Sequence, residues 1–555
     1  MAFLGNKSFT LTKKGAHRRK SFYDISGFFA DGERTLPLDE AAKLFLDEGK
    51  LPDVDRRKLG SDPAYYPAHR ANVIQYCKRD ADLAVRLGRL LIKTLEASLG
   101  FYPSRFNSKA SISKAWAEVT QPELFKKKPP RRWDLFRSSY KGGIFHTRVL
   151  GRVANVSEVD ITSAYGAALL KAPNVTKLSP IVSKSYHKEA LLGSYWILID
   201  YDGRLPLTAK ARGKKQARTV YPTSNGQLRP YTASKAEMDY FVESGRSFVV
   251  LMAEEYFGEY RPQFPELQTL LDKVAELKES AKTDPKAKVE RMLHKTIVNA
   301  LYGCLAESKH GETPLTNWPL AAEITGRCRA AIWREWDHQK SHGSVIVSIN
   351  TDSIRFAIDP EADFIPCESC AIRKGIGEFD NKFTGATVTH YQSGIALIEH
   401  SNGTTELRKR GKPLLTPEML RSATGPTVSV PSRHVTHLFE ALAQNRAEEI
   451  GAFDDPEDSG DDTKIDLASN RWALDFDPAD LRFEVLNVRP VIGTAPDYDD
   501  ITSGKYEARA RLAGVRTTRR TSAGPESPPR QPLPAPLQSE PSEIVRLPSI
   551  EPTSA

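Results

Sequence analysis

The chain has few cysteines and lacks the long apolar runs that cross a membrane. Its five cysteines are scattered, which excludes the disulfide framework of small secreted domains. Cys367 and Cys370 form one CxxC pair, but a zinc site needs two more ligands and no second pair occurs. No segment reaches the roughly 18 apolar residues of a spanning helix, and the N-terminal segment has no apolar centre like that of a signal peptide. We expect a reduced, soluble, cytoplasmic protein with no membrane partner.

Internal repeats are lacking too, so the 555 residues predict three or four structural units. Lysine and arginine (79) outnumber aspartate and glutamate (70), which gives a net charge of +9. Basic residues cluster at 126–132 and 212–218. This surplus suits a polyanionic partner, although a solvated basic surface explains it equally well. The acidic stretch 454–462 predicts a loop, and the Pro- and Ser-rich stretch 521–555 predicts a disordered tail.

The remaining sequence mixes helical and strand patterns and predicts an α+β fold. Apolar residues recur at helical spacing in the segments 82–96, 265–282 and 289–307. The turn signal Thr283-Asp-Pro-Lys separates the last two, which predicts an antiparallel helical hairpin. The β-rich runs 155–161, 345–349 and 354–358 predict strands, and a tight turn makes the last two a β-hairpin.

Asp160 ends the first of these strands. The small-residue turn that follows leads into a helix, in the order Asp160-Ile-Thr-Ser163-Ala164-Tyr165-Gly. Backbone N–H groups at such a turn can bind phosphate. Taken alone, this motif is explained more simply by an aspartate that caps the helix.

Lys295, Asn299 and Tyr302 follow one another at spacings that place them on one face of a helix. That face carries a cation for phosphate, an amide and an aromatic ring for stacking. An ordinary amphipathic helix with a buried tyrosine is the alternative, but it does not require a lysine on the same stripe.

Asp352 lies in the turn Asn350-Thr-Asp352-Ser of the β-hairpin. On such a turn it can meet Asp160 from a neighbouring strand, and two close carboxylates repel each other unless cations lie between them. Two Mg²⁺ ions about 3.5–4 Å apart would activate a 3′-hydroxyl and stabilise a leaving pyrophosphate. Taken alone, a plain polar turn is the simpler interpretation.

In this order the three motifs resemble motifs A (DxxSLYP), B (KxxxNSxYG) and C (DTDS) of family B DNA polymerases. Motif B matches at four of its five fixed positions. Tyr140-Lys-Gly142-Gly143 resembles the YxGG element, Gly326-Arg327 the end of the TxxGR element, and Lys409-Arg410-Gly411 the basic segment that enters the thumb. The resemblance extends over roughly residues 22–490.

The resemblance implies a role for each matching residue. Asp160 and Asp352, with Asn350, would hold two Mg²⁺ ions, or Mn²⁺. Tyr165 would be the steric gate against a 2′-hydroxyl. The backbone amides of Ser163 and Ala164 would contact the triphosphate, and the side chains of Lys295 and Lys278 would bind its phosphate groups. Asn299 and Tyr302 would pack against the nascent base pair. Primer-template DNA would contact Tyr140, Gly142, Gly143, Arg327, Lys409 and Arg410.

The sequence departs from the family in four places. Asn350 replaces an acid, which predicts weaker metal binding and makes Mn²⁺ a candidate ion beside Mg²⁺. Tyr76-Cys-Lys-Arg-Asp80 resembles the last motif of the 3′–5′ exonuclease, but its other metal-ligand motifs are missing. We therefore expect no autonomous proofreading and interpret Asp80 as an N-terminal residue of a helix. The stretch 302–326 is short, which predicts weak strand displacement. No clear KxY element occurs near Tyr391.

The resemblance implies a right-hand polymerase: an antiparallel palm sheet, helical-hairpin fingers and a thumb, after a partial RNase H-like exonuclease domain. The predicted units are 1–110 (partial exonuclease), 111–150 (linker), 151–261 and 309–400 (palm), 262–308 (fingers), 401–510 (thumb) and 511–555 (tail). The expected partners are template-primer DNA and dNTPs, with a terminal protein or a separate exonuclease-bearing chain as further candidates. Size alone favours a phage, plasmid or mobile element. A degenerate polymerase that only binds nucleic acid, and a protein-primed or primase-like initiator, remain open.

Overall fold

The chain separates into two units, Met1–Val515 and Arg516–Ala555. The structure, a computed structural model, describes residues 2–3, 8–12, 19–30, 35–51, 54–55, 58–59, 62–103, 106, 108–126, 134–210, 217–307, 313–358, 375–392, 394–409, 415–422, 427–431, 462–466, 491–492 and 498–499, all in the first unit. Several predictions lie outside these residues: the Cys367–Cys370 pair, Arg410, most of both basic clusters, most of the acidic loop, and the tail.

The N-terminal part combines a small antiparallel sheet with helices. The sheet contains β1 (Ala2–Phe3), β2 (Ser8–Thr12) and β3 (Arg19–Tyr23). The helices are η1 (Ser26–Phe28), α1 (Leu38–Leu46), α3 (Tyr65–Leu99), α4 (Lys109–Thr120), α5 (Pro122–Lys126) and α6 (Asp134–Ser139). The helix predicted at 82–96 is thus the C-terminal half of α3. It is amphipathic as expected, with Leu83, Leu87, Leu91 and Leu95 buried.

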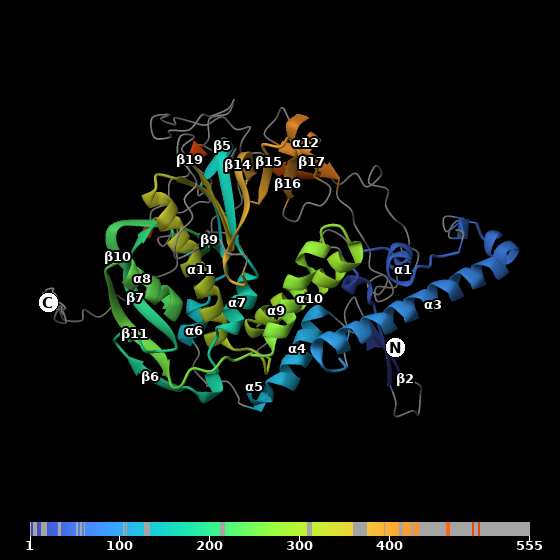
Figure 1. The fold of residues 1–555 in the computed structure, drawn as a ribbon, viewed down its shortest axis with the longest axis horizontal. Coiled ribbons are helices and arrows are strands. Elements are labelled where there is room, and N and C mark those ends of the chain that lie inside the picture. The colour runs from blue at the N-terminus through green and yellow to red at the C-terminus, as the bar shows by residue number, and fades with distance from the viewer. Residues whose placement is uncertain are drawn as a thin grey trace, which may run out of the picture. The chain divides into compact units, whose positions relative to one another are not determined.

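The largest sheet that the structure describes, here called the central sheet, is antiparallel and has β5 as its middle strand (Figure 1). Its strand order is β16 (Thr405–Lys409), β15 (Ile395–Glu399), β14 (Phe379–Gln392), β5 (Val149–Ile161), β13 (Ser353–Ala357), β12 (Val345–Thr351) and β4 (Ile144–Thr147). The short strand β19 (Val491–Ile492) pairs with the start of β5. The predicted strands and β-hairpin are confirmed, and β5 begins six residues earlier than the sequence pattern indicated.

A second antiparallel sheet has the order β10 (Thr223–Ser234), β7 (Leu192–Asp202), β11 (Phe248–Phe257) and β6 (Ser179–Ser183). Helix α8 (Lys235–Glu243) follows β10 directly, and a complete capping box from Ser234 and Glu237 starts it. The smaller pieces are η2 (Val175–Lys177), α12 (Pro417–Ser422) and the strand pairs β8 (Leu207–Lys210) with β9 (Ala217–Val220) and β17 (Thr427–Pro431) with β18 (Asp462–Asp466).

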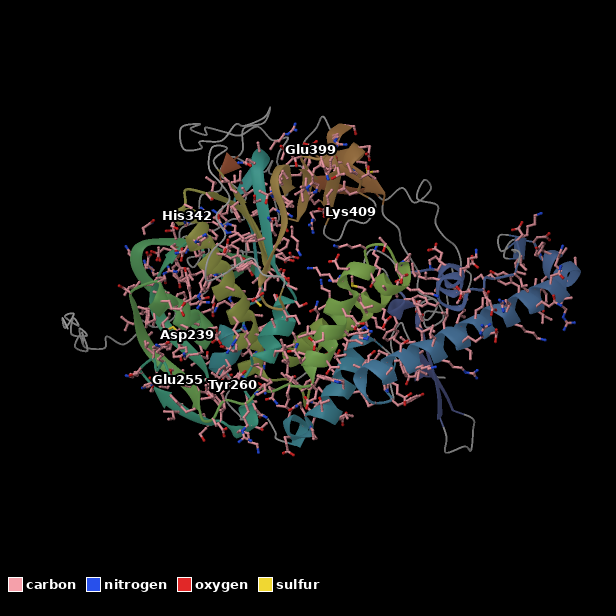
Figure 2. All side chains as sticks on the ribbon, viewed as in Figure 1. Asp239, Glu255, Tyr260, His342, Glu399 and Lys409 are labelled. Carbon is pink, nitrogen blue, oxygen red and sulfur yellow. The ribbon has the colours of Figure 1, made fainter. Side chains whose placement is uncertain are left out.

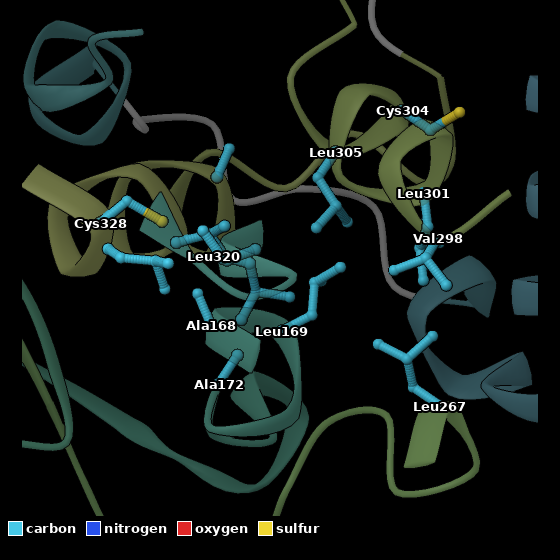
Figure 3. Close-up of a cluster of buried hydrophobic side chains, with 14 of the residues drawn as sticks. Ala168, Leu169, Ala172, Leu267, Val298, Leu301, Cys304, Leu305, Leu320 and Cys328 are labelled. Carbon is cyan, nitrogen blue, oxygen red and sulfur yellow. The ribbon is translucent and has the colours of Figure 1, made fainter. Parts of the chain in front are cut away.

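The predicted helical hairpin is formed by α9 (Leu267–Ser280) and α10 (Pro285–Leu305). Asp284 caps α10 through the backbone N–H of Lys286, and Pro285 occupies the first helical position, where its missing N–H has no cost. α10 packs on α7 (Ala164–Leu170) and on α11 (Trp318–Ser341) through a shared apolar core (Figure 3). Within the described residues, no helix combines the length and apolar character needed to cross a membrane.

The predicted domain boundaries stay predictions. The boundary at residue 400 falls between β15 and β16, which pair with each other and extend the central sheet.

Candidate active site

Asp160 is the second-last residue of β5, and the chain turns into α7 immediately afterwards. The residue that caps α7 is Ser163, whose backbone is left-handed (φ 52°, ψ 45°) and whose side chain makes no capping hydrogen bond. The simpler interpretation of Asp160 as a helix cap is therefore wrong. A left-handed non-glycine residue is uncommon and costs conformational energy, so the turn after Asp160 is held by its surroundings.

Asp352 lies in the turn of the β-hairpin, as predicted, and is the single residue between β12 and β13. Asn350 and Ser353 pair across this hairpin, and Thr351 between them is left-handed with φ 63°. Ser353 is in turn the register partner of Asp160 on β5. The backbone N–H of Ile161 donates to the carbonyl of Asp352 at 2.8 Å. Sheet pairing thus brings the two aspartates side by side from positions 192 residues apart in the sequence.

The pKa values of both carboxyl groups are shifted by their surroundings. Burial, and then the charge of Asp160, raise the pKa of Asp352 to about 7. Burial also raises the pKa of Asp160, and the Lys382 ammonium opposes that rise. The positive charge of the Lys295 ammonium lowers the pKa of both carboxyl groups and so opposes the effect of burial. Two partly buried carboxylates in which the charge of one disfavours the charge of the other are suited to a cation.

These residues fit a magnesium site with few protein carboxylates. Among the described residues, no three His, Cys, Asp or Glu side chains gather into a metal-binding group. Asp160 and Asp352 would therefore share a cation with neutral oxygens, including the Asn350 amide. Mg²⁺ commonly binds through one or two carboxylates, with water and substrate phosphates completing its shell.

Lys295, Asn299 and Tyr302 lie on the outer stripe of α10. Lys295 and Asn299 are exposed and Tyr302 is partly buried, as their common face requires. The opposite stripe, with Val298 and Leu301, packs into the apolar core (Figure 3). The predicted shared face of the three residues is confirmed.

Three tyrosines connect this helix to the turn after Asp160 and to the YxGG segment. The rings of Tyr165 and Tyr302 stack with centroids 4.4 Å apart and planes 2° from parallel. The hydroxyl groups of Tyr140 and Tyr302 share a hydrogen bond of 3.0 Å. The sequence motifs thus form a continuous aromatic wall beside the two aspartates.

Gly143 lies at the closest approach of this wall to the β-hairpin. A Cβ atom on Gly143 would lie 2.5 Å from Thr351 Cγ2 and 3.0 Å from the Tyr165 hydroxyl oxygen. A Cβ atom on Gly142 would meet no heavy atom within 4 Å. The second glycine of the YxGG segment is therefore required by space, and the first is not.

A buried ion pair holds this segment in place. Arg329 and Glu237 are both fully buried and joined at 2.9 Å. The Arg329 guanidinium also donates to the carbonyls of Lys141 and Gly142. No sequence motif marks Arg329, because its partners come from α8 and from the segment before β4.

Two further residues of the site had no motif to mark them. The Lys382 ammonium lies 3.0 Å from Asp160 Oδ2 and 3.3 Å from Asp380 Oδ2. Lys278, predicted as a phosphate ligand, is joined to the same Asp380 oxygen at 2.9 Å. The alternating charges of Asp380 and Lys382 within a strand were the only signal that could have found them.

The remaining predicted residues lie in other surroundings. Asp80 is in the interior of α3, which begins at Tyr65, so its interpretation as a helix N-terminal residue is wrong. It is joined to Lys50 at 2.8 Å, and Lys50 also donates to the Tyr76 hydroxyl. Sequence reasoning failed here because the apolar pattern before residue 82 is weak.

Arg327 and Lys409 are described as well. Arg327 Nε donates to the buried Glu323 at 2.8 Å, and both line a pocket of about 300 Å³ beside α7. Lys409 is exposed at the end of β16 (Figure 2). Its ammonium donates to the carbonyl of Leu415.

No protein-family model and no curated protein matches the sequence. Among solved structures, the fold matches phi29 DNA polymerase complexed with primer-template DNA and incoming nucleotide substrates, at 18% identity and a TM-score of 0.52, over 77% of this chain and 79% of the other. An orthorhombic crystal form of phi29 DNA polymerase matches at 18% identity and a TM-score of 0.49, over 75% of this chain and 77% of the other. The family B DNA polymerase from the hyperthermophilic archaeon Pyrobaculum calidifontis matches at 14% identity and a TM-score of 0.33, over 68% of this chain and 43% of the other.

The likeness to the first of these structures extends over most of both chains. At 18% identity it is evidence of fold, and it agrees with the antiparallel sheets and helical hairpin described above. The predicted α+β polymerase architecture is thus confirmed, and this chain has the fold of phi29 DNA polymerase.

Proposed function

We propose that the chain is a DNA-directed DNA polymerase that adds deoxynucleotides to a primer 3′-hydroxyl by two-metal nucleotidyl transfer. The observation that carries the proposal is that sheet pairing brings the partly buried Asp160 and Asp352 together, in a fold shared with a polymerase, and that the charge of Asp160 helps to raise the pKa of Asp352. Phosphoryl-transfer sites need positioned carboxylates that bind cations and exclude water.

Asp160 and Asp352 would hold two Mg²⁺ ions, with Asn350 as a neutral ligand. When bound, these ions lower the pKa of the attacking hydroxyl and offset the charge of the leaving pyrophosphate. The chain's own part is to hold the carboxylates still, which the β5–β13 pairing and the Ile161–Asp352 hydrogen bond do. Mn²⁺ is a second candidate ion because an amide at position 350 gives the site one charge less than three acids would.

The nucleotide would lie between the two aspartates and α10. Lys295 is the exposed cation on that side, and its charge already acts on both carboxyl groups. The stacked rings of Tyr165 and Tyr302 offer a flat wall for the sugar and base, with Asn299 one turn before Tyr302. The backbone amides of Ser163 and Ala164 would contact the triphosphate, and Lys278 is a further phosphate ligand once it leaves Asp380.

The proposed partner is primer-template DNA, with which phi29 DNA polymerase is complexed in the matching structure. The net charge of +9 favours such a polyanion. Tyr140 is part of the aromatic wall, and Gly142 and Gly143 follow it in the chain; we propose that they contact the primer end. Arg327, Lys409 and Arg410 are further residues proposed to contact the DNA. We also propose a cytoplasmic enzyme of a phage or plasmid, with a terminal protein or a separate exonuclease-bearing chain as further candidate partners.

We propose further that the chain does not proofread by itself. The one carboxylate of the exonuclease-like motif, Asp80, is joined to the Lys50 ammonium. A single carboxylate with a lysine counter-ion lacks the ligands for two-metal hydrolysis.

Primer extension tests the proposal directly. Wild-type protein, Asp352→Ala and the control Asp272→Ala, which changes an exposed aspartate on α9, are incubated with a labelled template-primer, dNTPs and either Mg²⁺ or Mn²⁺. We expect extension by the wild type and the control, and a loss of at least about 10³-fold in Asp352→Ala. Equal activity of the wild type and Asp352→Ala would refute the assignment of Asp160 and Asp352 as the catalytic site.

A degenerate polymerase that only binds DNA is the second candidate, and the amide at Asn350 is the observation that favours it. The same assay separates the two functions. A degenerate protein binds template-primer at every concentration of either metal but never extends it.

A further inference from the structure

Four charged side chains form an alternating row from the proposed metal site to the helical hairpin. Asp160 is joined to Lys382, Lys382 to Asp380, and Asp380 to Lys278, at distances of 3.0, 3.3 and 2.9 Å. All four are partly buried, with 19–33% of each side chain exposed. Ion pairs at this depth are screened less by salt than surface pairs.

Strand pairing explains why the row starts at Asp160. Asp380 on β14 is the register partner of Asp160 on β5, so their side chains share a face of the sheet. Without a cation between them, two opposed carboxylates would repel each other. The register shifts between Asn381 and Phe383, which leaves Lys382 as an extra residue in a β-bulge. From this bulge the ammonium of Lys382 reaches both carboxylates.

A metal ion and an ammonium group compete for the negative charge of the Asp160 carboxylate. Lys382 occupies Oδ2 of the carboxylate that the proposed function assigns to Mg²⁺. A divalent cation there would repel the ammonium across one carboxylate group. Asp380 offers Lys382 a second partner without a change of strand pairing, because Lys382 already lies within 3.3 Å of it.

We propose that Lys382 is a resident counter-ion of Asp160, which competes with the metal ion and withdraws to Asp380 when the metal binds. Lys382 and Asp380 are thus positioning residues that set the metal affinity of the site. When Lys382 moves to Asp380, the ion pair between Asp380 and Lys278 weakens, because both ammonium groups contact Oδ2 of Asp380. Metal binding then prepares Lys278 to meet the triphosphate. This inference rests on the proposed function for the identity of the metal ligand.

Mn²⁺ binding to the full chain, without DNA or nucleotide, tests the competition. The free ion is counted by electron paramagnetic resonance at one pH, and Asp160→Asn identifies the part of the binding that belongs to this site. We expect Lys382→Met to bind Mn²⁺ about three- to tenfold more tightly than the wild type, as the loss of one partly buried competing ion pair implies. Asp380→Asn should bind it more weakly by a similar factor, because Lys382 then has only Asp160.

Lys273→Met is the matched control, since it removes an exposed ammonium from α9 outside the row, and it should leave Mn²⁺ binding unchanged. Circular dichroism verifies that each variant is folded, and Lys382→Gln replaces Lys382→Met if the latter is not. Unchanged or weaker Mn²⁺ binding by the folded Lys382 variant would overturn the inference. So would a Lys382 variant that changes only the KM for dNTPs, because Lys382 would then be a phosphate ligand.

The two proposals fail in different ways. If the wild type extends primers while Lys382→Met binds Mn²⁺ as the wild type does, the polymerase function stands and the competition is wrong. If the wild type extends no primer but Lys382→Met still binds Mn²⁺ more tightly, the competition stands and the polymerase function is wrong.

Discussion

Gly143→Ala adds one methyl group at the place where the YxGG segment touches the β-hairpin. The new Cβ would lie 2.5 Å from Thr351 Cγ2, 3.0 Å from the Tyr165 hydroxyl oxygen and 3.1 Å from Thr351 Cα. A rotation of the Thr351 side chain cannot relieve the contact with its own Cα. The backbone of Thr351 must therefore move, and Asp352 is the next residue.

The expected cost follows from these contacts. Overpacking by one methyl group typically costs about 1–3 kcal/mol of stability. Thr351 is already in a left-handed conformation with φ 63°, so its backbone has little freedom to adjust. A displacement of a catalytic group by about 1 Å lowers the rate on the order of 10²-fold. We expect Gly143→Ala to lose activity of that order while it remains folded.

Gly142→Ala is the matched control, because a Cβ there meets nothing within 4 Å. Urea denaturation gives the free energy of unfolding of both variants, and primer extension gives their rates. Gly142→Ala should resemble the wild type in both assays. If the two alanine variants behave alike, the close approach at Gly143 does not position Asp352 and the reasoning is refuted.

Three further outcomes are expected. Burial, and then the charge of Arg148, lower the pKa of His146 to about 3. The stability that the neutral His146 contributes to the folded protein is therefore complete above pH ~6.5 and is lost as the pH falls towards 3. His146→Phe, which preserves the stacking on Tyr221, should reduce the fall in unfolding free energy between pH 6.5 and 4.5 by up to about 1.4 kcal/mol per pH unit; parallel curves would contradict this. Glu237→Ala leaves the buried Arg329 unpaired and should cost about 3–5 kcal/mol in urea denaturation, and a loss below about 1 kcal/mol would show that the pair is not needed. The purified chain should leave a mismatched primer 3′ end intact, and its measured removal would refute the proposal that the chain does not proofread.

The sequence determined the features that depend on neighbours along the chain. Helical spacing and the Thr283-Asp-Pro-Lys turn were enough to predict α9 and α10, because a helix face and a turn are local. The alternation of β-rich runs with one tight turn was enough for the hairpin that carries Asp352. The order of the three motifs then predicted that Asp160 and Asp352 would meet, which the pairing of β13 with β5 confirms.

Only the tertiary structure decided which distant charges meet. Asp380 and Lys382 reach Asp160 because β14 pairs with β5 and because a bulge shifts the register by one residue. Strand partners and bulges are determined by packing across the sheet, so they cannot be predicted from the sequence of β14 alone. The same holds for Asp80 and Lys50, and for the fully buried Arg329 and Glu237. A charge in a sequence is usually a solvated surface charge, and only the fold determines which charges are buried together and must be paired.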